Sequence, residues 1–297
     1  MPRRVPAIVL HWNNPDGAMR TARSMREHAP FCDVTIVENG SSPEARAEIE
    51  QLTAAEGVRL VTLDRNLGFT GGMNFAVLRA GLCTLDDFVV LSCHGIEVTS
   101  GCVDRLVAAM EADERAGLVA PRISNDTPES FNAPADWEAL PETSLVPISW
   151  AVGGLTLLRV SAFQSVGGYD ERMFAYWEDA DLTKRLRSAG WTFGMIPSAV
   201  ILEDGSTLPR FGRIYLIARN QILSSQKDGP AAVLGQAWKT LVSSGQCMLA
   251  SLVPWRSAER RAVSRLFARG HFYALTDALS GVTGPGRAIA VPPKQAS

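Results

Sequence analysis

Short apolar runs alternate with stretches of helical periodicity through the first ninety residues. The apolar runs are four to six residues long, and each ends in a polar or glycine-containing turn. Such runs are typical of strands buried on both faces, and their alternation with helices favours a parallel sheet. We therefore expect an α/β fold with a mostly parallel sheet and helices on both faces. The predicted strands are 7–10, 33–37, 58–63 and 88–91, and the predicted helices end near His28, Glu56 and Leu82.

Ligands of such sheets bind outside the carboxyl ends of the strands. The turns that follow the four predicted strands should therefore border one crevice. They are 11–17, 38–42, 64–74 and 92–97. Farther along, 124–147 is proline-rich and irregular, 150–158 is predicted to be a strand, and the pattern is helical from about 211.

The charge balance argues against a nucleic-acid partner. Lys plus Arg is 29 and Asp plus Glu is 31, so the formal charge is -2. Five cysteines without a CxxC pair indicate neither a disulfide framework nor a zinc knuckle, which favours a reducing cytoplasm. No stretch looks like a signal peptide or a membrane span, so we expect a cytoplasmic protein. Peripheral contact with the inner face of the membrane is compatible with this pattern.

Acidic residues begin a predicted helix near the middle of the chain. Glu178, Asp179 and Asp181 lie at its start, and Lys184 and Arg187 lie toward its end. One interpretation is that these charges complement the helix dipole. The other is that a carboxylate at the lip of the crevice takes a proton from an acceptor hydroxyl.

Six segments, in order and spacing, resemble family 2 glycosyltransferases of the rhamnosyltransferase-like type. They are 9–13, 37–41, 66–74, 153–159, 166–171 and 177–181. The resemblance covers about residues 5–225. It implies a GT-A fold, a nucleoside diphosphate sugar donor (a dTDP-deoxysugar is one candidate) and inversion at the anomeric carbon. The implied acceptor is a hydroxyl of a glycan, a lipid-linked saccharide or a secondary metabolite.

The resemblance also implies roles for particular residues. Asp179 resembles the catalytic base, and Glu178 would orient the donor or the acceptor. Glu38 resembles the acid that contacts the nucleotide, although a β-turn role is the alternative. The remaining implied donor-binding residues are Trp12, Asn13, Asn66, Gly68, Gly71, Gly72 and Asn74, and the implied acceptor-binding residues are Trp150, Gly153, Gly154 and Trp177.

The chain departs from the family pattern where a metal is usually bound. His94 occupies the place of the metal-binding Asp of a DxD-like motif, and Glu203 occupies the place of a downstream His. Three alternatives stay open. In the first, His94 and Glu203 hold Mn²⁺, because such a pair is less suited to bind Mg²⁺ tightly. In the second, transfer needs no metal, and His94, Arg210 or Arg213 neutralises the charge of the departing diphosphate. In the third, the chain is a non-catalytic nucleotide-sugar-binding or scaffold relative.

The sequence suggests a catalytic domain over 1–225 and a helical segment over 226–297. Apolar residues at helical spacing in this segment favour packing on the catalytic domain, on a second copy in a homo-oligomer, or on the acceptor. A basic cluster follows Trp255 at Arg256, Arg260 and Arg261. A solvated helix face is the favoured interpretation, and contact with anionic lipid is the alternative.

Overall fold

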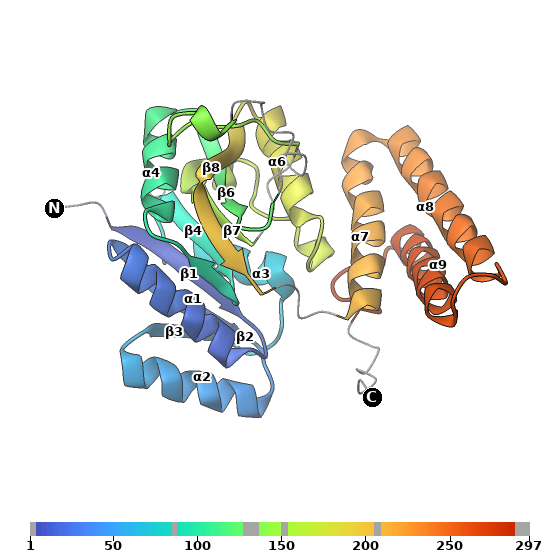
Figure 1. Ribbon diagram of the computed structural model, residues 1–297, viewed down its shortest axis with the longest axis horizontal. Coiled ribbons are helices and arrows are strands. Elements are labelled where there is room, and N and C mark those ends of the chain that lie inside the picture. The colour runs from blue at the N-terminus through green and yellow to red at the C-terminus, as the bar shows by residue number, and fades with distance from the viewer. Residues whose placement is uncertain (1–3, 85–87, 127–136, 150–153, 205–208, 289–297) are drawn as a thin grey trace. The chain divides into compact units, whose positions relative to one another are not determined.

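The computed structural model describes residues 4–84, 88–126, 137–149, 154–204 and 209–288 (Figure 1). The chain divides into two compact units. The first unit comprises residues 1–169 and 179–205, and the second comprises 170–178 and 206–297.

An eight-stranded sheet forms the centre of the first unit, in the order β3-β2-β1-β4-β7-β6-β8-β5. The four predicted strands are all present, each within a few residues of its predicted bounds. The strands are β1 (Val5–His11), β2 (Cys32–Asn39), β3 (Arg59–Leu63), β4 (Phe88–Cys93), β5 (Ile96–Val98), β6 (Ala116–Ile123), β7 (Leu155–Arg159) and β8 (Thr192–Glu203).

The sheet is mostly parallel, as expected, but not purely so: of the seven strand pairings among the described residues, four are parallel, β6 with β8 among them, and three are antiparallel. Strands β1 to β4 are parallel to one another where they pair, as predicted. Strand β7 runs antiparallel to both β4 and β6, and β5 runs antiparallel to β8. The apolar runs show that these strands are buried but carry no information on their direction, which depends on how the connections cross.

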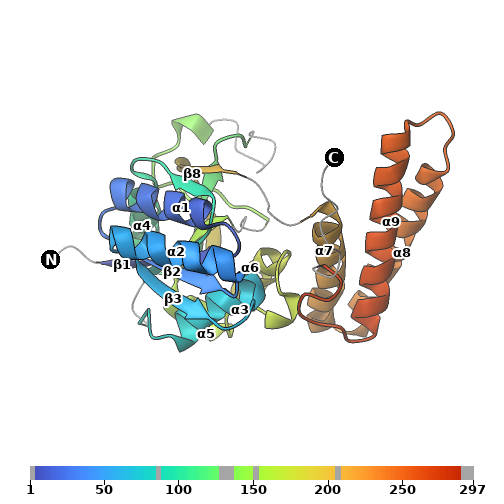
Figure 2. The ribbon, with the colours of Figure 1, turned by 90° about the horizontal axis from the view of Figure 1, so that it is seen from below.

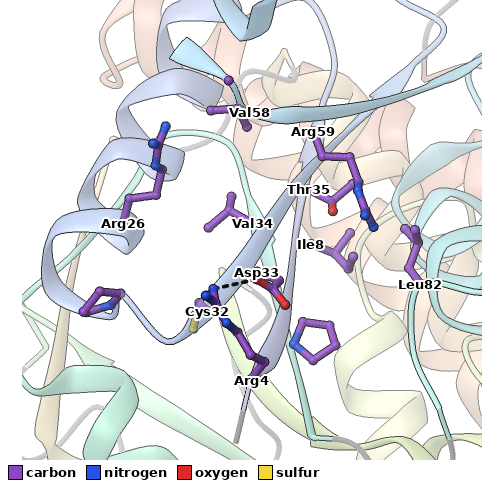
Figure 3. Close-up of a pocket in the computed structure, with 13 residues that line it drawn as sticks. Arg4, Ile8, Arg26, Cys32, Asp33, Val34, Thr35, Val58, Arg59 and Leu82 are labelled. Carbon is purple, nitrogen blue, oxygen red and sulfur yellow. Dashed lines mark hydrogen bonds and ion pairs between the residues drawn. The ribbon is translucent and has the colours of Figure 1, made fainter. Parts of the chain in front are cut away.

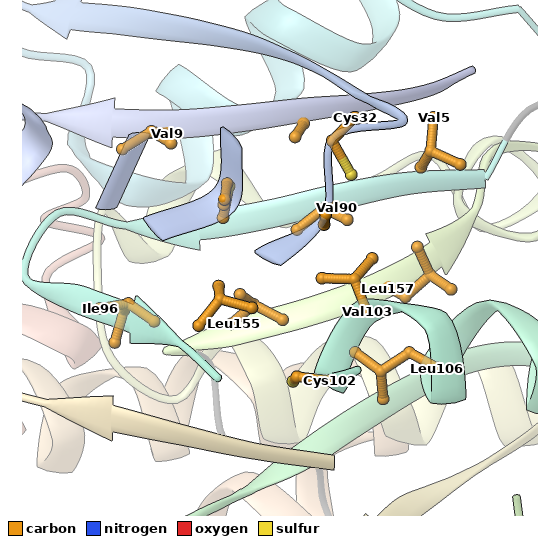
Figure 4. Packing of buried hydrophobic residues seen from close by; sticks show 14 of the residues in the cluster. Val5, Val9, Cys32, Val90, Ile96, Cys102, Val103, Leu106, Leu155 and Leu157 are labelled. Atoms are coloured by element: carbon orange, nitrogen blue, oxygen red, sulfur yellow. The ribbon is translucent and has the colours of Figure 1, made fainter. Parts of the chain in front are cut away.

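Helices cover both faces of the sheet because successive residues of a strand point to opposite faces. Val5 and Val9 of β1 pack in one core cluster with α1, α2 and α4, while Ile8 and Leu10 pack in another with α3, α5 and α6 (Figures 2 and 4). These helices are α1 (Pro15–His28), α2 (Pro43–Glu56), α3 (Gly68–Asn74), α4 (Cys102–Ala112), α5 (Val160–Ser165) and α6 (Glu178–Ser188).

The glycine-rich segment is itself helical, whereas a turn leading to a helix over 74–82 was expected. Helix α3 spans Gly68–Asn74 and continues as a π-helix over Phe75–Arg79. A Cβ at Gly72 would lie 2.6 Å from Leu10 Cδ1, so the small residue lets the helix approach β1 closely. Tight packing against the sheet outweighs the low helix propensity of glycine.

The second unit is built on three helices, as the periodicity after residue 211 predicted. They are α7 (Arg210–Ser225), α8 (Pro230–Ser251) and α9 (Ala258–Leu279). Phe174, from the segment 170–178, packs against Phe211 and Tyr215 of α7. Within the described part of the chain, no helix is both long and apolar enough to span a bilayer.

Candidate active site

The first two strands end side by side in a pair of buried polar residues. His11 and Glu38 are register partners at the carboxyl ends of β1 and β2, and both are fully buried. One Glu38 oxygen accepts a hydrogen bond from the Ser41 N–H at 2.5 Å, and the other lies 3.6 Å from Arg46 Nε. Glu38 therefore stabilises the turn that follows it, and its carboxylate is buried in this structure.

Asn13 joins the loops that follow these two strands. Its N–H donates to Ser41 Oγ at 2.9 Å, and its Oδ1 accepts from the Ser42 N–H at 2.8 Å. Asn13 has a φ of 50°, in the left-handed region that asparagine tolerates better than most residues. Trp12 beside it is half-buried. The structure thus places both predicted donor-binding residues of this loop at the rim next to Glu38.

Asn39 connects the glycine-rich segment to β2, a role that the sequence did not reveal. Its Nδ2 donates to Gly68 O at 3.0 Å and to Asn66 Oδ1 at 3.2 Å, and its Oδ1 accepts from the Leu67 N–H at 2.9 Å. Asn66 also accepts from the Gly68 N–H at 2.7 Å. Gly71 and Gly72 are buried on the same helix. The predicted donor-binding segment is therefore fixed beside the Glu38 turn.

Asn74 joins two of the segments that carried the family resemblance. Its Nδ2 donates to Tyr169 O and its Oδ1 accepts from the Tyr169 N–H, both at 2.9 Å. At Gly168, with a φ of 72°, an added Cβ would lie 2.6 Å from Asn74 Oδ1. The side chain that we predicted to bind the donor thus ties α3 to the segment that precedes the acidic helix.

His94 lies at the end of β4 with its ring turned toward β1. Its Nδ1 is 3.2 Å from Leu10 O. A carbonyl oxygen only accepts, so Nδ1 carries the proton of this bond. Burial lowers the pKa of His94 below its ordinary value. The ring is therefore neutral at pH 7, and its Nε2 carries a lone pair rather than a positive charge.

Glu203 ends β8, opposite Ile96 in the register with β5. Partial removal from water, together with the charge of Asp126, raises the pKa of Glu203. The neighbouring Asp204 is ion-paired with Arg20. Among the described residues, no three His, Cys, Asp or Glu side chains are arranged to hold a metal ion. One imidazole and one carboxylate do not make a metal centre by themselves.

Asp179 lies half-buried in the first turn of α6. Its Oδ1 accepts from the Ala180 N–H at 2.7 Å. Farther along the helix, Leu182 and Leu186 pack in the same core cluster as Leu10 of β1 and Leu91 of β4. Helix α6 therefore covers the sheet face that also carries α3.

Asp181 has a structural partner on its own helix. It is buried and accepts from Arg185 Nε at 2.7 Å, while Arg185 Nη1 donates to Val166 O and Gly168 O. Asp181 thus orients the arginine that holds the preceding loop. Of the acids at this helix start, this leaves Glu178, which is buried, and Asp179 as candidates for chemistry.

The loop before Glu178 has an unusual backbone. Phe174, Tyr176 and Trp177 have φ values of 67°, 64° and 72°, a region that large side chains rarely occupy. Asn220 Nδ2 of α7 donates to the carbonyls of Met173, Ala175 and Tyr176 at 2.9, 2.9 and 2.6 Å. Arg219 beside it donates to Met173 O at 3.0 Å.

Arg219 and Asn220 were not predicted from the sequence. Their one visible signal is that two adjacent polar residues interrupt the apolar face of α7, and both are fully buried. Backbone strain of this kind persists only where its surroundings hold it, and it is common at functional sites. The pair therefore holds the half-buried Trp177 and its neighbours in one conformation just before the candidate catalytic acids.

The remaining predicted residues are only partly placed by the structure. Gly154 is buried at the start of β7, and its carbonyl accepts from the Cys93 N–H at 2.9 Å. Arg210 is exposed at the first position of α7. Trp150 and Gly153 lie outside the described residues.

A separate hollow of about 600 Å³ lies at the amino ends of β1, β2 and β3 (Figure 3). Arg4, Arg26, Asp33 and Arg59 are among the residues that line it, and Arg4 is paired with Asp33 at 2.9 Å. It lies at the opposite ends of the strands from Glu38 and His94, so it is not part of the predicted nucleotide site.

His11 should make stability depend on pH. Burial, assisted by neighbouring His94, lowers the pKa of His11 from 6.5 to about 4. Between these values the unfolded chain binds a proton that the folded chain does not, so stability decreases as the pH falls. We expect a loss of about 3 kcal/mol in unfolding free energy between pH 6.5 and 4. Urea unfolding of the wild type and of His11→Gln measures it, and an equally steep loss in the variant would contradict the assignment.

The comparisons with known proteins agree with this architecture. The model of the family described as Glycosyl transferase family 2 matches residues 7–181, which is more than half of the chain. The mannosyltransferase PcManGT from Pyrobaculum calidifontis, solved with GDP-Man and Mn²⁺, superposes with a TM-score of 0.60 at 14% identity, covering 93% of this chain and 87% of that one. At that identity the likeness shows the GT-A fold alone.

Two curated relatives are glycosyltransferases of Mycobacterium tuberculosis. An N-acetylglucosaminyl-diphospho-decaprenol L-rhamnosyltransferase is 30% identical over 206 residues, covering 57% of this chain and 66% of the relative. A pre-mycofactocin glycosyltransferase is 27% identical over 216 residues, covering 69% of this chain and 43% of the relative. The chain thus spans just under two thirds of the first relative and less than half of the second. With the family match and the fold in agreement, the chain belongs to glycosyltransferase family 2 and has the GT-A fold.

Proposed function

We propose that this chain transfers a sugar, with inversion at the anomeric carbon, from a nucleoside diphosphate sugar to an acceptor hydroxyl. The observation that carries the proposal is the arrangement of the first unit. Glu38 and the glycine-rich helix α3 lie together at the carboxyl ends of the parallel strands, and Asp179 lies in the first turn of α6, on the same sheet face as α3. Ligands of open α/β sheets bind at these strand ends.

The proposed reaction is a single in-line displacement. The Asp179 carboxylate takes the proton of the acceptor hydroxyl as that oxygen attacks the anomeric carbon. The bond from this carbon to the diphosphate oxygen breaks on the opposite face, and the nucleoside diphosphate leaves with the bonding electrons. Holding both substrates in line is the main contribution of such a site. Glu178 is proposed to orient the donor or the acceptor.

The proposed donor is a dTDP-deoxysugar, and the proposed acceptor is a saccharide linked to a lipid diphosphate. The deoxysugar and the acceptor are suggested by the relative named N-acetylglucosaminyl-diphospho-decaprenol L-rhamnosyltransferase, and the dTDP carrier by the resemblance to rhamnosyltransferase-like members of the family. The test is a transfer assay with dTDP-, UDP- and GDP-sugars and a short-chain polyprenyl diphosphate saccharide. A retained anomeric configuration in the product would refute the proposed inversion. A preference for UDP- or GDP-sugars would refute the proposed dTDP donor.

The same assay, run with EDTA and with added Mn²⁺, tests the predicted pair of His94 and Glu203. Transfer that survives EDTA would eliminate an ion between them. Transfer that EDTA abolishes and Mn²⁺ restores would support it, because an imidazole and a carboxylate suit Mn²⁺. His94→Ala should then raise the Mn²⁺ concentration that is needed.

Glu38→Gln should weaken nucleotide binding about tenfold, the effect of losing a charged hydrogen bond to the nucleoside. The amide oxygen can still accept from the Ser41 N–H, so the turn is kept. The matched control is Glu50→Gln, because Glu50 Oε1 lies 3.8 Å from the same Arg46 Nε but is exposed on α2. Titration calorimetry with the nucleoside diphosphate measures both. Equal affinities for the two variants would leave Glu38 with the turn role alone.

A further inference from the structure

Helix α8 presents its large apolar side chains to solvent. Leu234 is 71% exposed, Trp238 is 66% exposed, and Trp255, just after the helix, is 87% exposed. Six exposed apolar residues lie within one face of α8, and two more follow the end of the helix. We call this face the apolar stripe: Leu234, Trp238, Leu241, Val242, Met248, Leu249, Leu252 and Trp255.

The inner face of α8 is made of small polar residues. Its buried residues are Thr240, Ser244 and Ser251, and Ser244 Oγ donates to Ala268 O of α9 at 2.9 Å. Helix α7 of the same unit buries large apolar residues such as Phe211 and Leu216 instead. A helix in water normally turns its apolar face inward. Helix α8 reverses this arrangement, because its buried face is small and polar and its exposed face is large and apolar. Small residues at the helix–helix contact and large apolar residues on the outer face are typical of helices in contact with lipid.

Helix α9 has the same kind of packed face. Gly270, Ala274 and Ala278 are buried at intervals of four residues. A Cβ at Gly270 would lie 2.7 Å from Ile214 Cγ2, so α9 and α7 approach closely there. Helices α8 and α9 therefore bury mainly small side chains, and the large side chains of α8 are left for another partner.

Positive charge gathers where the apolar stripe ends. The sequence has no acidic residue from 229 to 258. Arg256 and Arg260 are exposed and line a hollow of about 450 Å³, which Glu259 and Val263 also line. Arg261 Nη1 donates to Pro254 O at 3.0 Å, which fixes the turn that carries Trp255. Tryptophan beside arginine at the end of an apolar face suits the headgroup region of an anionic bilayer.

We propose that the apolar stripe and the adjoining arginines dock on an anionic membrane surface, with α8 lying in the plane of the interface. The helix lies on the bilayer rather than crossing it, because no helix in the described ranges is apolar enough to span one. A second copy of the chain would cover the stripe but would bring the same positive charge to it. The proposal goes beyond sugar transfer and does not depend on it.

Flotation of the full chain with lipid vesicles tests the proposal. We expect binding to vesicles of phosphatidylcholine mixed with phosphatidylglycerol, and at least about tenfold weaker binding to phosphatidylcholine alone. The double variant Trp238→Gln/Leu249→Gln should bind the mixed vesicles at least about tenfold more weakly. Arg256→Ala/Arg260→Ala should lose about twentyfold on the mixed vesicles and little on the neutral ones.

The controls separate surface loss from unfolding. Arg59→Ala removes an exposed arginine of the first unit and should bind vesicles as the wild type does. Because all four substituted stripe and cluster residues are exposed, the melting temperatures should be unchanged. Absence of vesicle binding, or equal binding to neutral and anionic vesicles, would overturn the proposal. So would a wild-type dimer in sedimentation that Trp238→Gln/Leu249→Gln converts to a monomer without any vesicle binding.

Discussion

Replacing Asp179 by asparagine should lower kcat by about three orders of magnitude, within the range expected for loss of a general base. The amide has the same size and its oxygen can still accept from the Ala180 N–H. It has no basic oxygen to take the proton of the acceptor hydroxyl. The affinity for the nucleoside diphosphate should stay within about twofold, because the displacement chemistry, not nucleotide binding, uses this group. Steady-state transfer and calorimetry measure the two quantities.

The alternative role of Asp179, complementing the dipole of α6, predicts a different outcome. Asparagine would then reduce stability by about 1 kcal/mol or less and would leave kcat nearly unchanged. Asp181→Asn is the matched control, because Asp181 lies on the same turn but is paired with Arg185 at 2.7 Å. This control should lower the melting temperature with a much smaller effect on kcat. Turnover above about a tenth of wild type in Asp179→Asn would refute the base assignment.

The strands of the nucleotide-binding half were predictable because buried parallel strands carry continuous apolar runs. Each such run ends where a polar turn begins, so β1, β2 and β4 were placed within a few residues. The directions of β5 and β7 were not predictable, since both pair with strands far away in the sequence. An apolar run is the same in either direction, and only the path of the chain decides between them.

Side-chain hydrogen bonds between distant segments could not be predicted from the sequence for a related reason. Asn39 and Asn74 look like ordinary turn or helix residues. Yet the Asn39 side chain makes three hydrogen bonds to residues 27 to 29 positions away, and the Asn74 side chain makes two to a residue 95 positions away. Because asparagine is common in turns, its presence there gives no sign that its side chain bonds to a distant segment. The acids in the first turn of α6 were easier to predict, because negative charge at a helix start is a recognisable pattern.

Asn220→Ala should lower kcat about ten- to one-hundredfold, because a small misplacement near the reacting groups has effects of that size. The change removes the donor that holds the carbonyls of Met173, Ala175 and Tyr176. The left-handed residues Tyr176 and Trp177 would then relax toward common backbone angles, which moves the chain directly before Glu178 and Asp179. We also expect a loss of up to about 3 kcal/mol of stability, because the carbonyls of Ala175 and Tyr176 lose this donor while Met173 O keeps its bond from Arg219.

Comparing the effect of Asn220→Ala on kcat with its effect on KM and nucleotide affinity distinguishes a role in positioning Asp179 from a role in stability alone. Nucleotide affinity and the KM for the donor should be unchanged in Asn220→Ala, because His11, Glu38 and Asn39 belong to the first unit. Gln221→Ala is the matched control: Gln221 is the next residue on α7 and bonds Gln236 of α8 at 3.0 Å. Gln221→Ala should lower the free energy of unfolding somewhat and leave kcat unchanged. If Asn220→Ala loses stability but keeps full kcat below its melting temperature, the loop conformation is needed for folding of the second unit and does not set the position of Asp179.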